Sequence, residues 1–389
     1  MSSSWDPDAV LAAHAALVPV AWRVGSAEVP LASAVGLRGY PGLDPALPAL
    51  AEALARSRVA PPQRPFVDAT GGVGALIALA RALGGPPGRL LVASAAALRA
   101  ALGAGVEPSA LEPGFPWDLP PGSVEEAWWR PASERGWSRV RAELDGWARA
   151  LQPGGRLVAV WHKDEGGKRA ERMAAERFEA LQVVTRAAGW RVVELTRPRP
   201  DVPVPDPWCH WRGPDGPMQT LAGTFAAERV DAGTAALLTA LERDALRGAR
   251  VLDLGCGSGL LSLHALRAGA ACVWALDDDL AAVRSSEAVV SGAPGAVVRW
   301  SDLTLDVPEV RAVDVVLTNP PFHVGRRVVG ALSEGFVAAA ATALRPQGRL
   351  WLVANAALPF ERLLASWHDL RDVTPAKLPG YRVLTASRP

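Results

Sequence analysis

The stretch RVLDLGCGSGLLSLHALRAGA, residues 250–270, joins a short apolar run, a glycine-rich turn and an apolar spacing typical of a helix. VLDLG has the length of a strand, and GLLSLHALRAG repeats apolar residues at helical intervals. Gly255, Gly257 and Gly259 lie between the two, where the missing Cβ permits a tight turn and a close approach of backbone to ligand. The stretch therefore predicts one β-α unit with a binding loop.

Further apolar runs of strand length follow this unit. VWAL comes before Asp277, VVRW before Asp302, DVVLT before Asn319, and RLWLVAN starts at Arg349. Helix-compatible stretches such as GFVAAAATAL separate them, and strands that alternate with helices imply a parallel sheet. The final segment RDVTPAKLPGYRVLTAS has two extended stretches around a Leu-Pro-Gly turn, which predicts an antiparallel hairpin at the sheet edge.

The first half of the chain repeats the same series of elements. PFVDATGGVGALIALARALGG, which begins at Pro65, aligns without a gap with residues 250–270, so that Asp68 matches Asp253 and Gly72 matches Gly257. LQPGGRLVAVW in the first half also matches LRPQGRLWLVAN in the second. The alternative is that any two α/β domains share this order of strand, turn and helix. We interpret the repeat as a duplication.

A proline-rich segment separates the two copies. RPRPDVPVPDPWCHWRGPDGP, residues 197–217, has prolines too closely spaced for a helix or an interior strand. We expect a domain at 1–197, a linker at 198–218 and a second domain at 219–389. A length of 389 residues fits this division, since domains average about 150 residues.

Composition excludes several classes of protein. With 49% hydrophobic and 21% charged residues, the chain has enough apolar material for buried cores and is not a disordered protein. The net charge of +1 does not attract nucleic acid as a whole, so a polyanion must bind a local patch. Three cysteines without metal-ligand spacing argue against disulfides and zinc, and we expect no metal. We find no leader or membrane-spanning run and expect a soluble, cytoplasmic monomer.

The glycine loop and the acidic residues near it suggest the kind of ligand. G-x-G-x-G is not the G-x-G-x-x-G of dinucleotide sites, and Asp253 would repel phosphate while attracting an ammonium group. Asp277 ends the next strand, where a carboxylate can accept both ribose hydroxyls. The alternative for the run Asp277 to Asp279 is a solvated loop. Asp302 is a further candidate, for contact with an adenine amino group.

The segment TNPPFH, residues 318–323, is the strongest chemical signal. Pro320 and Pro321 fix the backbone and donate no hydrogen bonds, so neighbouring carbonyls are available as acceptors. Asn319 adds a side-chain oxygen, and Phe322 offers a face for a planar ring. The segment fits the amino group of a nucleobase, although an Asn-Pro-Pro turn can also simply end a strand.

VLDLGCGSG, Asp277 and TNPPFH together resemble the class I S-adenosylmethionine-dependent methyltransferases that act on amino nitrogens. The NPPFH variant, the segment GTFAAERVDAGTAALL with Phe225, Asp231, Gly233 and Thr234, and the altered first copy are similar to the bacterial 16S ribosomal RNA guanine-N2 methyltransferases of the RsmC type. This resemblance is good from Thr220 onward and looser before it. It implies an α/β fold of two tandem Rossmann-like domains with mostly parallel seven-stranded sheets, each closed by an antiparallel hairpin.

The resemblance also implies a cofactor, a substrate and a set of site residues. The cofactor is S-adenosylmethionine, and the substrate is 16S ribosomal RNA or the small ribosomal subunit. The catalytic residues are Asn319, Pro320 and Phe322. The cofactor site comprises Thr234, Asp253, Gly255, Cys256, Gly257, Gly259, Asp277, Asp278, Asp302, Leu303 and Asn319. The substrate site comprises Pro321, Phe322, His323, Arg326 and Arg327, of which the two arginines fit a solvated loop equally well.

The first copy departs from this pattern. Thr70 stands where the second copy has Gly255, Ser94 falls near the acidic position, and WWRP, residues 128–131, lacks the asparagine. We expect the first domain to bind no cofactor and to serve as a scaffold or RNA contact. Four other functions remain open: methylation of a 23S ribosomal RNA guanine, of a DNA adenine or of a protein glutamine, and a non-catalytic, RNA-binding role in ribosome assembly.

Overall fold

A computed structural model describes residues 7–56, 58–303, 310–321, 323–324, 327–328, 330–367 and 370–389. The chain divides into two compact units, one of Leu17–Pro207 and one of Met1–Ala16 with Trp208–Pro389. Within the described ranges, no helix has the length and apolarity needed to cross a bilayer. The same ranges hold no group of three or more His, Cys, Asp or Glu side chains placed to bind a metal ion.

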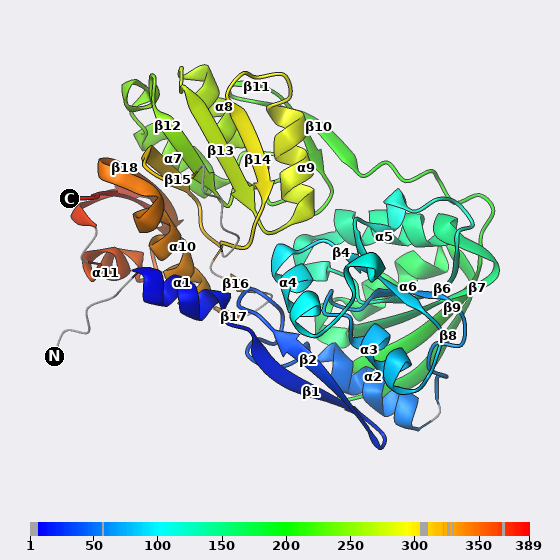
Figure 1. The fold of residues 1–389 in the computed structure, drawn as a ribbon. Coiled ribbons are helices and arrows are strands. Elements are labelled where there is room, and N and C mark those ends of the chain that lie inside the picture. Colours follow the sequence, from blue (N-terminus) through cyan, green and yellow to red (C-terminus); the bar gives the residue numbers. More distant parts are fainter. Residues whose placement is uncertain are drawn as a thin grey trace. The chain divides into compact units, whose positions relative to one another are not determined.

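The unit Leu17–Pro207 is built on a seven-stranded sheet (Figure 1). Its first five strands are parallel, and the last two form an antiparallel hairpin on β7. In sheet order the strands are β5 (Leu111–Pro113), β4 (Gly88–Val92), β3 (Phe66–Ala69), β6 (Val124–Trp129), β7 (Leu151–His162), β9 (Trp190–Pro198) and β8 (Phe178–Ala187). The helices are α2 (Ala46–Ala55), α3 (Ala75–Ala82), α4 (Ala95–Gly103), α5 (Trp137–Ala150) and α6 (Gly167–Ala175). A separate hairpin, β1 (Val18–Val24) with β2 (Ala27–Ser33), precedes them.

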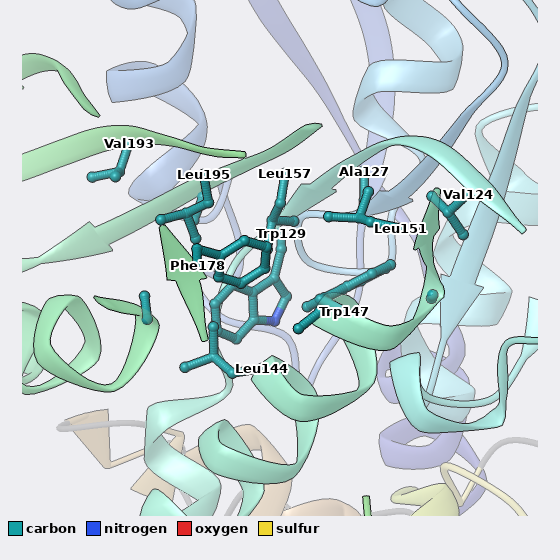
Figure 2. Close-up of a cluster of buried hydrophobic side chains, with 14 of the residues drawn as sticks. Val124, Ala127, Trp129, Leu144, Trp147, Leu151, Leu157, Phe178, Val193 and Leu195 are labelled. Atoms are coloured by element: carbon teal, nitrogen blue, oxygen red, sulfur yellow. The ribbon is translucent and has the colours of Figure 1, made fainter. Parts of the chain in front are cut away.

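Tryptophans form much of the core of this unit. Trp129, Trp147 and Phe178 are at most 2% exposed and lie together beneath the sheet among aliphatic side chains (Figure 2). Large aromatic side chains bury more apolar area than any other type and therefore dominate the energetics of such a core. The interpretation of isolated tryptophans as core residues is confirmed for these two.

The second unit has a sheet of the same kind (Figure 1). In sheet order its strands are β14 (Ala296–Trp300), β13 (Cys272–Asp277), β12 (Arg250–Leu254), β15 (Val313–Thr318), β18 (Leu344–Asn355), β20 (Tyr381–Ser387) and β19 (Arg371–Leu378). The expected parallel strands and the C-terminal antiparallel hairpin are confirmed. The helices are α1 (Pro7–Ala15), α7 (Ala232–Ala240), α8 (Leu260–Arg267), α9 (Leu280–Val289), α10 (Gly330–Ala343) and α11 (Phe360–Ala365).

The two sheets have the same strand order, which supports the duplication. Ranked along the chain within each unit, the strands of both sheets run 3-2-1-4-5-7-6. Helix α2 precedes β3 as α7 precedes β12, and a two-stranded hairpin comes before each helix. The predicted fold of two tandem Rossmann-like domains is confirmed.

The borders of the units differ from the expected domains in two places. The proline-rich segment is irregular only between β9 and residue 208, where β10 (Trp208–Gly213) starts a hairpin with β11 (Gly216–Leu221). A two-stranded hairpin tolerates Pro217 because each of its strands is an edge. Helix α1, expected in the first domain, packs on α10 of the second unit (Figure 1).

Candidate functional site

The candidate site residues lie where three adjacent strands end. β13 and β15 flank β12 on its two sides, so the glycine loop, Asp277 and Asn319 follow neighbouring strands at one edge of the sheet. The Thr318 hydroxyl donates to the carbonyl oxygen of Leu254 at 2.7 Å and joins the ends of β15 and β12. Open α/β sheets bind ligands at this carboxyl edge, where the strand order reverses.

The three glycines of the loop serve two purposes. All three have positive φ, at 76°, 54° and 76° for Gly255, Gly257 and Gly259. A Cβ on Gly255 would lie 3.0 Å from the Phe336 ring, and one on Gly259 would lie 2.9 Å from Ser286 Cα, so packing excludes a side chain at both. A Cβ on Gly257 would meet no non-adjacent residue closer than 4.0 Å. The atom such a Cβ would meet is the Phe225 Cβ, so Gly257 leaves more room than the other two glycines for a ligand to approach the backbone.

Cys256, inside the loop, has a structural environment. Its side chain is 6% exposed, and its sulfur accepts a hydrogen bond from the Ser286 hydroxyl at 3.1 Å. Burial raises the pKa of the Cys256 thiol well above its usual range. The thiol therefore stays neutral, and its contribution to the loop is to fill a small space between strand and helix.

Asp253 is the buried acidic residue of the site. Its carboxyl group is fully buried at the end of β12, and Oδ2 accepts a hydrogen bond from the Ser262 hydroxyl at 2.6 Å. Oδ1 is also buried and has no hydrogen-bond partner among the described residues. Burial, with the nearby charge of Asp277, raises the pKa of Asp253 to about 7. An unpartnered buried carboxylate oxygen is unfavourable, and a ligand that brings a cationic donor to it removes the penalty.

Asp277 is held rigidly at the end of β13. Its Oδ2 accepts from the backbone N–H of Gly257 at 2.9 Å, and its Oδ1 accepts from that of Asp279 at 2.9 Å. Asp279 in turn caps α9 by accepting from the N–H of Ala281 at 3.0 Å. The alternative of a solvated acidic loop is wrong for these two aspartates.

The loop after β14 receives a side chain from the far end of the sequence. Asp302 is 5% exposed, and its carbonyl oxygen accepts a hydrogen bond from His14 Nε2 at 3.1 Å. His14 belongs to α1 and is 3% exposed. Leu303, next in the chain, has a φ of 74°. Sequence patterns did not reveal His14 because 288 positions separate it from Asp302.

Asp278 is tied to the same region through its backbone. Its carbonyl oxygen accepts a hydrogen bond from the Trp300 indole N–H at 2.6 Å, and Trp300 is the last residue of β14. The ends of β13 and β14 are therefore joined, and Asp278 and Asp302 lie on linked loops. Their roles in cofactor binding remain predictions.

Asn319 is oriented by the first turn of α7. Its side-chain Nδ2 donates to Asp231 Oδ2 and to Thr234 Oγ1, each at 3.1 Å. A carboxylate only accepts hydrogen bonds, so the amide nitrogen must face Asp231 and the amide oxygen must face away from it. Pro320 is buried and Pro321 is exposed. Thr234 is predicted to bind the cofactor. In the structure its hydroxyl oxygen accepts a hydrogen bond from Asn319.

The remaining candidates lie at the border of the described chain. Phe322 and Arg326 lie outside the described residues. His323 and Arg327 belong to a short antiparallel pair, β16 (His323–Val324) with β17 (Arg327–Val328), of which the backbone is described. Their roles toward the substrate remain predictions.

In the first unit, neighbouring groups of the chain satisfy or fill the corresponding strand ends. Asp68 Oδ1 accepts from the Thr70 N–H at 3.0 Å and the Thr70 hydroxyl at 2.7 Å, and Oδ2 accepts from the Leu76 N–H at 3.0 Å. A Cβ on Gly72 would lie 2.7 Å from Ala97, so this position has less room than Gly257, where the nearest atom would be at 4.0 Å.

Sheet register identifies the first unit's other substitutions. Asp68 pairs with Leu90 as Asp253 pairs with Ala275, so Val92 stands at the position in the first unit that Asp277 occupies in the second. Ser94 therefore matches Asp279, and both cap a helix; the match to the acidic position is two residues earlier than expected.

The asparagine position of the first unit holds an arginine. Arg130 follows β6 directly, as Asn319 follows β15. Arg130 Nε lies 3.1 Å from each oxygen of Asp44, and its NH2 group lies 2.9 Å from Glu165 Oε2. Burial raises the pKa of Asp44 to about 6, against the opposing effect of an N–H donor and of Arg38. An ion-pair cluster thus occupies the place of an acceptor site.

A family model described as methyltransferase small domain matches residues 215–385. A ribosomal RNA small subunit methyltransferase C from Pseudomonas aeruginosa is 33% identical over 247 residues, which cover 61% of this chain and 73% of that protein. A protein of the same name from Acinetobacter baumannii is 32% identical over 169 residues, 43% of this chain, and the match spans about half (49%) of that relative.

Two further matches are a relative with a different name and a solved structure. A ribosomal RNA large subunit methyltransferase G from Streptomyces avermitilis is 38% identical over 162 residues, which cover 39% of this chain and 42% of that protein. A solved structure of a T. thermophilus 16S rRNA N2 guanine-1207 methyltransferase (RsmC), in complex with AdoMet and guanosine, is 30% identical and superposes with a TM-score of 0.83. That match covers 97% of this chain and 100% of the other.

Proposed function

This chain belongs to the RsmC-type family of class I S-adenosylmethionine-dependent methyltransferases, and from that premise we propose that it methylates the N2 amino group of a guanine in 16S ribosomal RNA. The observation that carries the proposal is the fixed amide of Asn319, whose nitrogen faces Asp231. Its oxygen is then the group available to accept a hydrogen bond from an exocyclic amine.

Residues of the second unit fit the cofactor. The ammonium group would contact Asp253 Oδ1, which has no hydrogen-bond partner within the described part of the chain, and the ribose hydroxyls would contact the anchored carboxylate of Asp277. The room beside Gly257 would let the ligand come close to the backbone. The bound cofactor supplies an electrophilic methyl group on a sulfonium sulfur. We place the adenine against Asp278, Asp302 and Leu303, which follow the neighbouring strands β13 and β14.

The protein's own contribution to the reaction is positioning and electrostatics. Hydrogen bonds from the guanine amine to the Asn319 oxygen and the Pro320 carbonyl would direct the nitrogen lone pair and stabilise the positive charge that develops on it. Alignment of this kind can account for about 7 to 11 kcal/mol of a barrier. The methylated nitrogen is acidic and loses its proton to water, so the chain needs no general base.

The base must leave its stack to reach this pocket, and we propose Phe322 as the ring that receives it. Arg326 and Arg327 would bind flanking phosphates, and His323 would contact RNA. We further propose that the first unit binds no cofactor, since Thr70, Val92 and Arg130 replace the three groups that make the other site open and polar. Calorimetry on the full chain should then give one cofactor per protein molecule.

A second candidate substrate is a guanine of the large-subunit RNA, favoured by the match to a large subunit methyltransferase G. Both substrates are tested by offering labelled S-adenosylmethionine with small subunits, large subunits, naked ribosomal RNA and DNA in parallel, followed by nucleoside analysis. We expect N2-methylguanosine in the 16S RNA. Label in 23S RNA alone would show that the substrate is the large-subunit RNA, and label in adenosine would overturn the proposal.

The same assay tests the acceptor role of Asn319. Asn319→Ala should retain cofactor binding and lose most of the turnover. Asn355→Ala is a matched control, because Asn355 is the only other asparagine of the chain and is exposed at the end of β18. Unchanged turnover in Asn319→Ala would refute the role.

A further inference from the structure

Asp231 stands at a junction between the first turn of α7 and the residue after β15. Its Oδ2 accepts from the backbone N–H of Gly233 at 2.9 Å and of Thr234 at 3.1 Å, and from Asn319 Nδ2 at 3.1 Å. One carboxylate oxygen therefore both caps the helix and binds the side-chain amide of Asn319. The Thr234 hydroxyl, 3.1 Å from Asn319 Nδ2, adds a second acceptor from the same turn.

The first turn of α7 is itself held close to the sheet. A Cβ on Gly233 would lie 2.9 Å from the Tyr381 ring, so the absence of a side chain lets this turn approach β20 closely. Thr234 is only 8% exposed. Asp231 therefore projects from a packed element, and the direction in which it presents its carboxylate is set by that packing.

The charge of Asp231 determines which end of the amide meets it. With Nδ2 toward the carboxylate, Asn319 makes two hydrogen bonds; with the amide turned over, its oxygen would face another acceptor and repel it. A turned amide would present NH2 to the substrate amine, which also donates, and the acceptor would be lost.

The first unit supplies an independent observation of a similar pairing. Asp44 lies just before Pro45, the N-cap residue of α2, and accepts from the N–H of Ala46 at 2.8 Å; it also binds Arg130, which occupies the position of Asn319. The aspartate before the helix thus binds the residue after the fourth strand in both units, whether that residue is an amide or a guanidinium. The common feature is a carboxylate that holds a donor in place.

We propose that Asp231 is a positioning residue, which locks the Asn319 amide with its oxygen toward the substrate amine. This inference rests on the proposed function, because only an amine substrate requires an acceptor at that point. The competing explanation is that Asp231 does nothing more than cap α7.

Two variants separate the explanations. Asp231→Ser keeps a good helix cap in a side chain that is one atom shorter and uncharged, so the cap survives while Asn319 loses its carboxylate. We expect kcat to fall about 10- to 100-fold with the KM for the cofactor and the melting temperature little changed. Asp231→Asn, which has the same size and retains one acceptor oxygen, should recover part of the loss. Asp244→Ser, at an exposed aspartate, is the matched control.

A double-mutant cycle with Asn319 gives a readout that capping would not produce. In the Asn319→Ala background, Asp231→Ser should cause no further loss of kcat, since the amide it orients is gone. An equal loss in both backgrounds would show that Asp231 acts through the helix alone and would overturn the inference.

A second measurement does not depend on activity. Selective ¹⁵N labelling of asparagine gives two side-chain NH2 groups, each with a pair of proton signals, because the chain has two asparagines, and Asn355→Ala assigns them. Exchange of the Asn319 NH2 protons should be slow in the wild type and at least about tenfold faster in Asp231→Ser, which lacks the charged acceptor. Equal exchange rates would overturn the inference, even if wild-type protein methylates no RNA and the proposed function fails separately.

Discussion

The two units share one sheet order but treat the carboxyl ends of their central strands in opposite ways. In the second unit, Asp253 Oδ1 has no hydrogen-bond partner among the described residues, and a Cβ on Gly257 would meet no atom closer than 4.0 Å. In the first unit, Thr70 satisfies the matching aspartate and Ala97 fills the matching space. A binding site retains polar groups that the protein itself does not satisfy, and these are the groups that the closed unit has paired internally.

The same contrast extends to the asparagine position. Asn319 offers an uncharged amide held by Asp231, whereas Arg130 is bound within a buried ion cluster with Asp44 and Glu165. An arginine cannot accept a hydrogen bond from a substrate, and the ion pairs of Arg130 serve the fold of the first unit instead. The difference teaches that a duplicated domain can keep its topology while side chains at a few strand ends decide whether it binds.

The largest effect is expected at the buried ion pair of the first unit. Arg130→Met removes one partner of a pair in which the side chains of Arg130 and Asp44 are 4% and 9% exposed, and it leaves the buried Asp44 carboxylate without its hydrogen-bonded cation, with Arg38 as a remaining charge nearby. The free energy of unfolding of this unit should fall by about 3 to 5 kcal/mol. Urea unfolding followed by tryptophan fluorescence measures it, with exposed Arg141→Met as the control. A change no larger than the control's would mean that the cluster is not structural.

The next effect copies the first unit's residue into the second. Asn319→Arg removes the acceptor and places a cation where positive charge develops, so kcat should fall about 100- to 1000-fold. The cofactor affinity, measured by calorimetry, should change far less. If the reciprocal Arg130→Asn gave the chain a second cofactor site, the interpretation of the first unit as closed would be wrong.

A smaller effect is expected from Asp277→Val, which copies Val92. The variant removes the anchored carboxylate, and the loss of hydrogen bonds to a charged group, about 1.5 to 3 kcal/mol, corresponds to a rise in cofactor Kd of about 10- to 100-fold. The control is Asp201→Val, at an exposed aspartate of the irregular segment before β10. An unchanged Kd would contradict the ribose contact.

The smallest effect concerns pH. Because the pKa of Asp253 is raised to about 7, the free protein holds a proton there below pH 7, and a cationic ligand must displace it. Cofactor affinity should therefore rise with pH, by up to about tenfold between pH 6 and 8. Asp253→Asn should bind more weakly and lose this dependence on pH. A slope that persists in the variant would assign the titration to another group.

Sequence patterns predicted most of the sheet, because apolar runs of strand length ending in glycine or acidic turns are local signals. The β-α unit at residues 250–270, the strands before Asp277 and Asn319, and the C-terminal hairpin were all confirmed. The hairpin of β10 and β11 was missed, since its prolines read as a linker and only pairing shows that they lie on edges.

The partners of the site residues were the least predictable part. The bond between His14 and Asp302, and the one between Asp231 and Asn319, join residues far apart in the chain. Phe225, quoted for the resemblance, proved to be 58% exposed, which no local pattern indicated. Such contacts depend on how helices dock on the sheet.

By itself, the sequence determined the kinds of groups at the strand ends: glycines that admit a ligand, carboxylates, and an asparagine before two prolines. These follow from residue identity and spacing, which local backbone chemistry converts directly into strands and turns. Only the tertiary structure decided which carboxylate oxygen is left unpartnered, which way the Asn319 amide points, and to which unit α1 belongs. Burial and hydrogen-bond satisfaction are properties of packed neighbours, and packing brings together residues that the chain keeps apart.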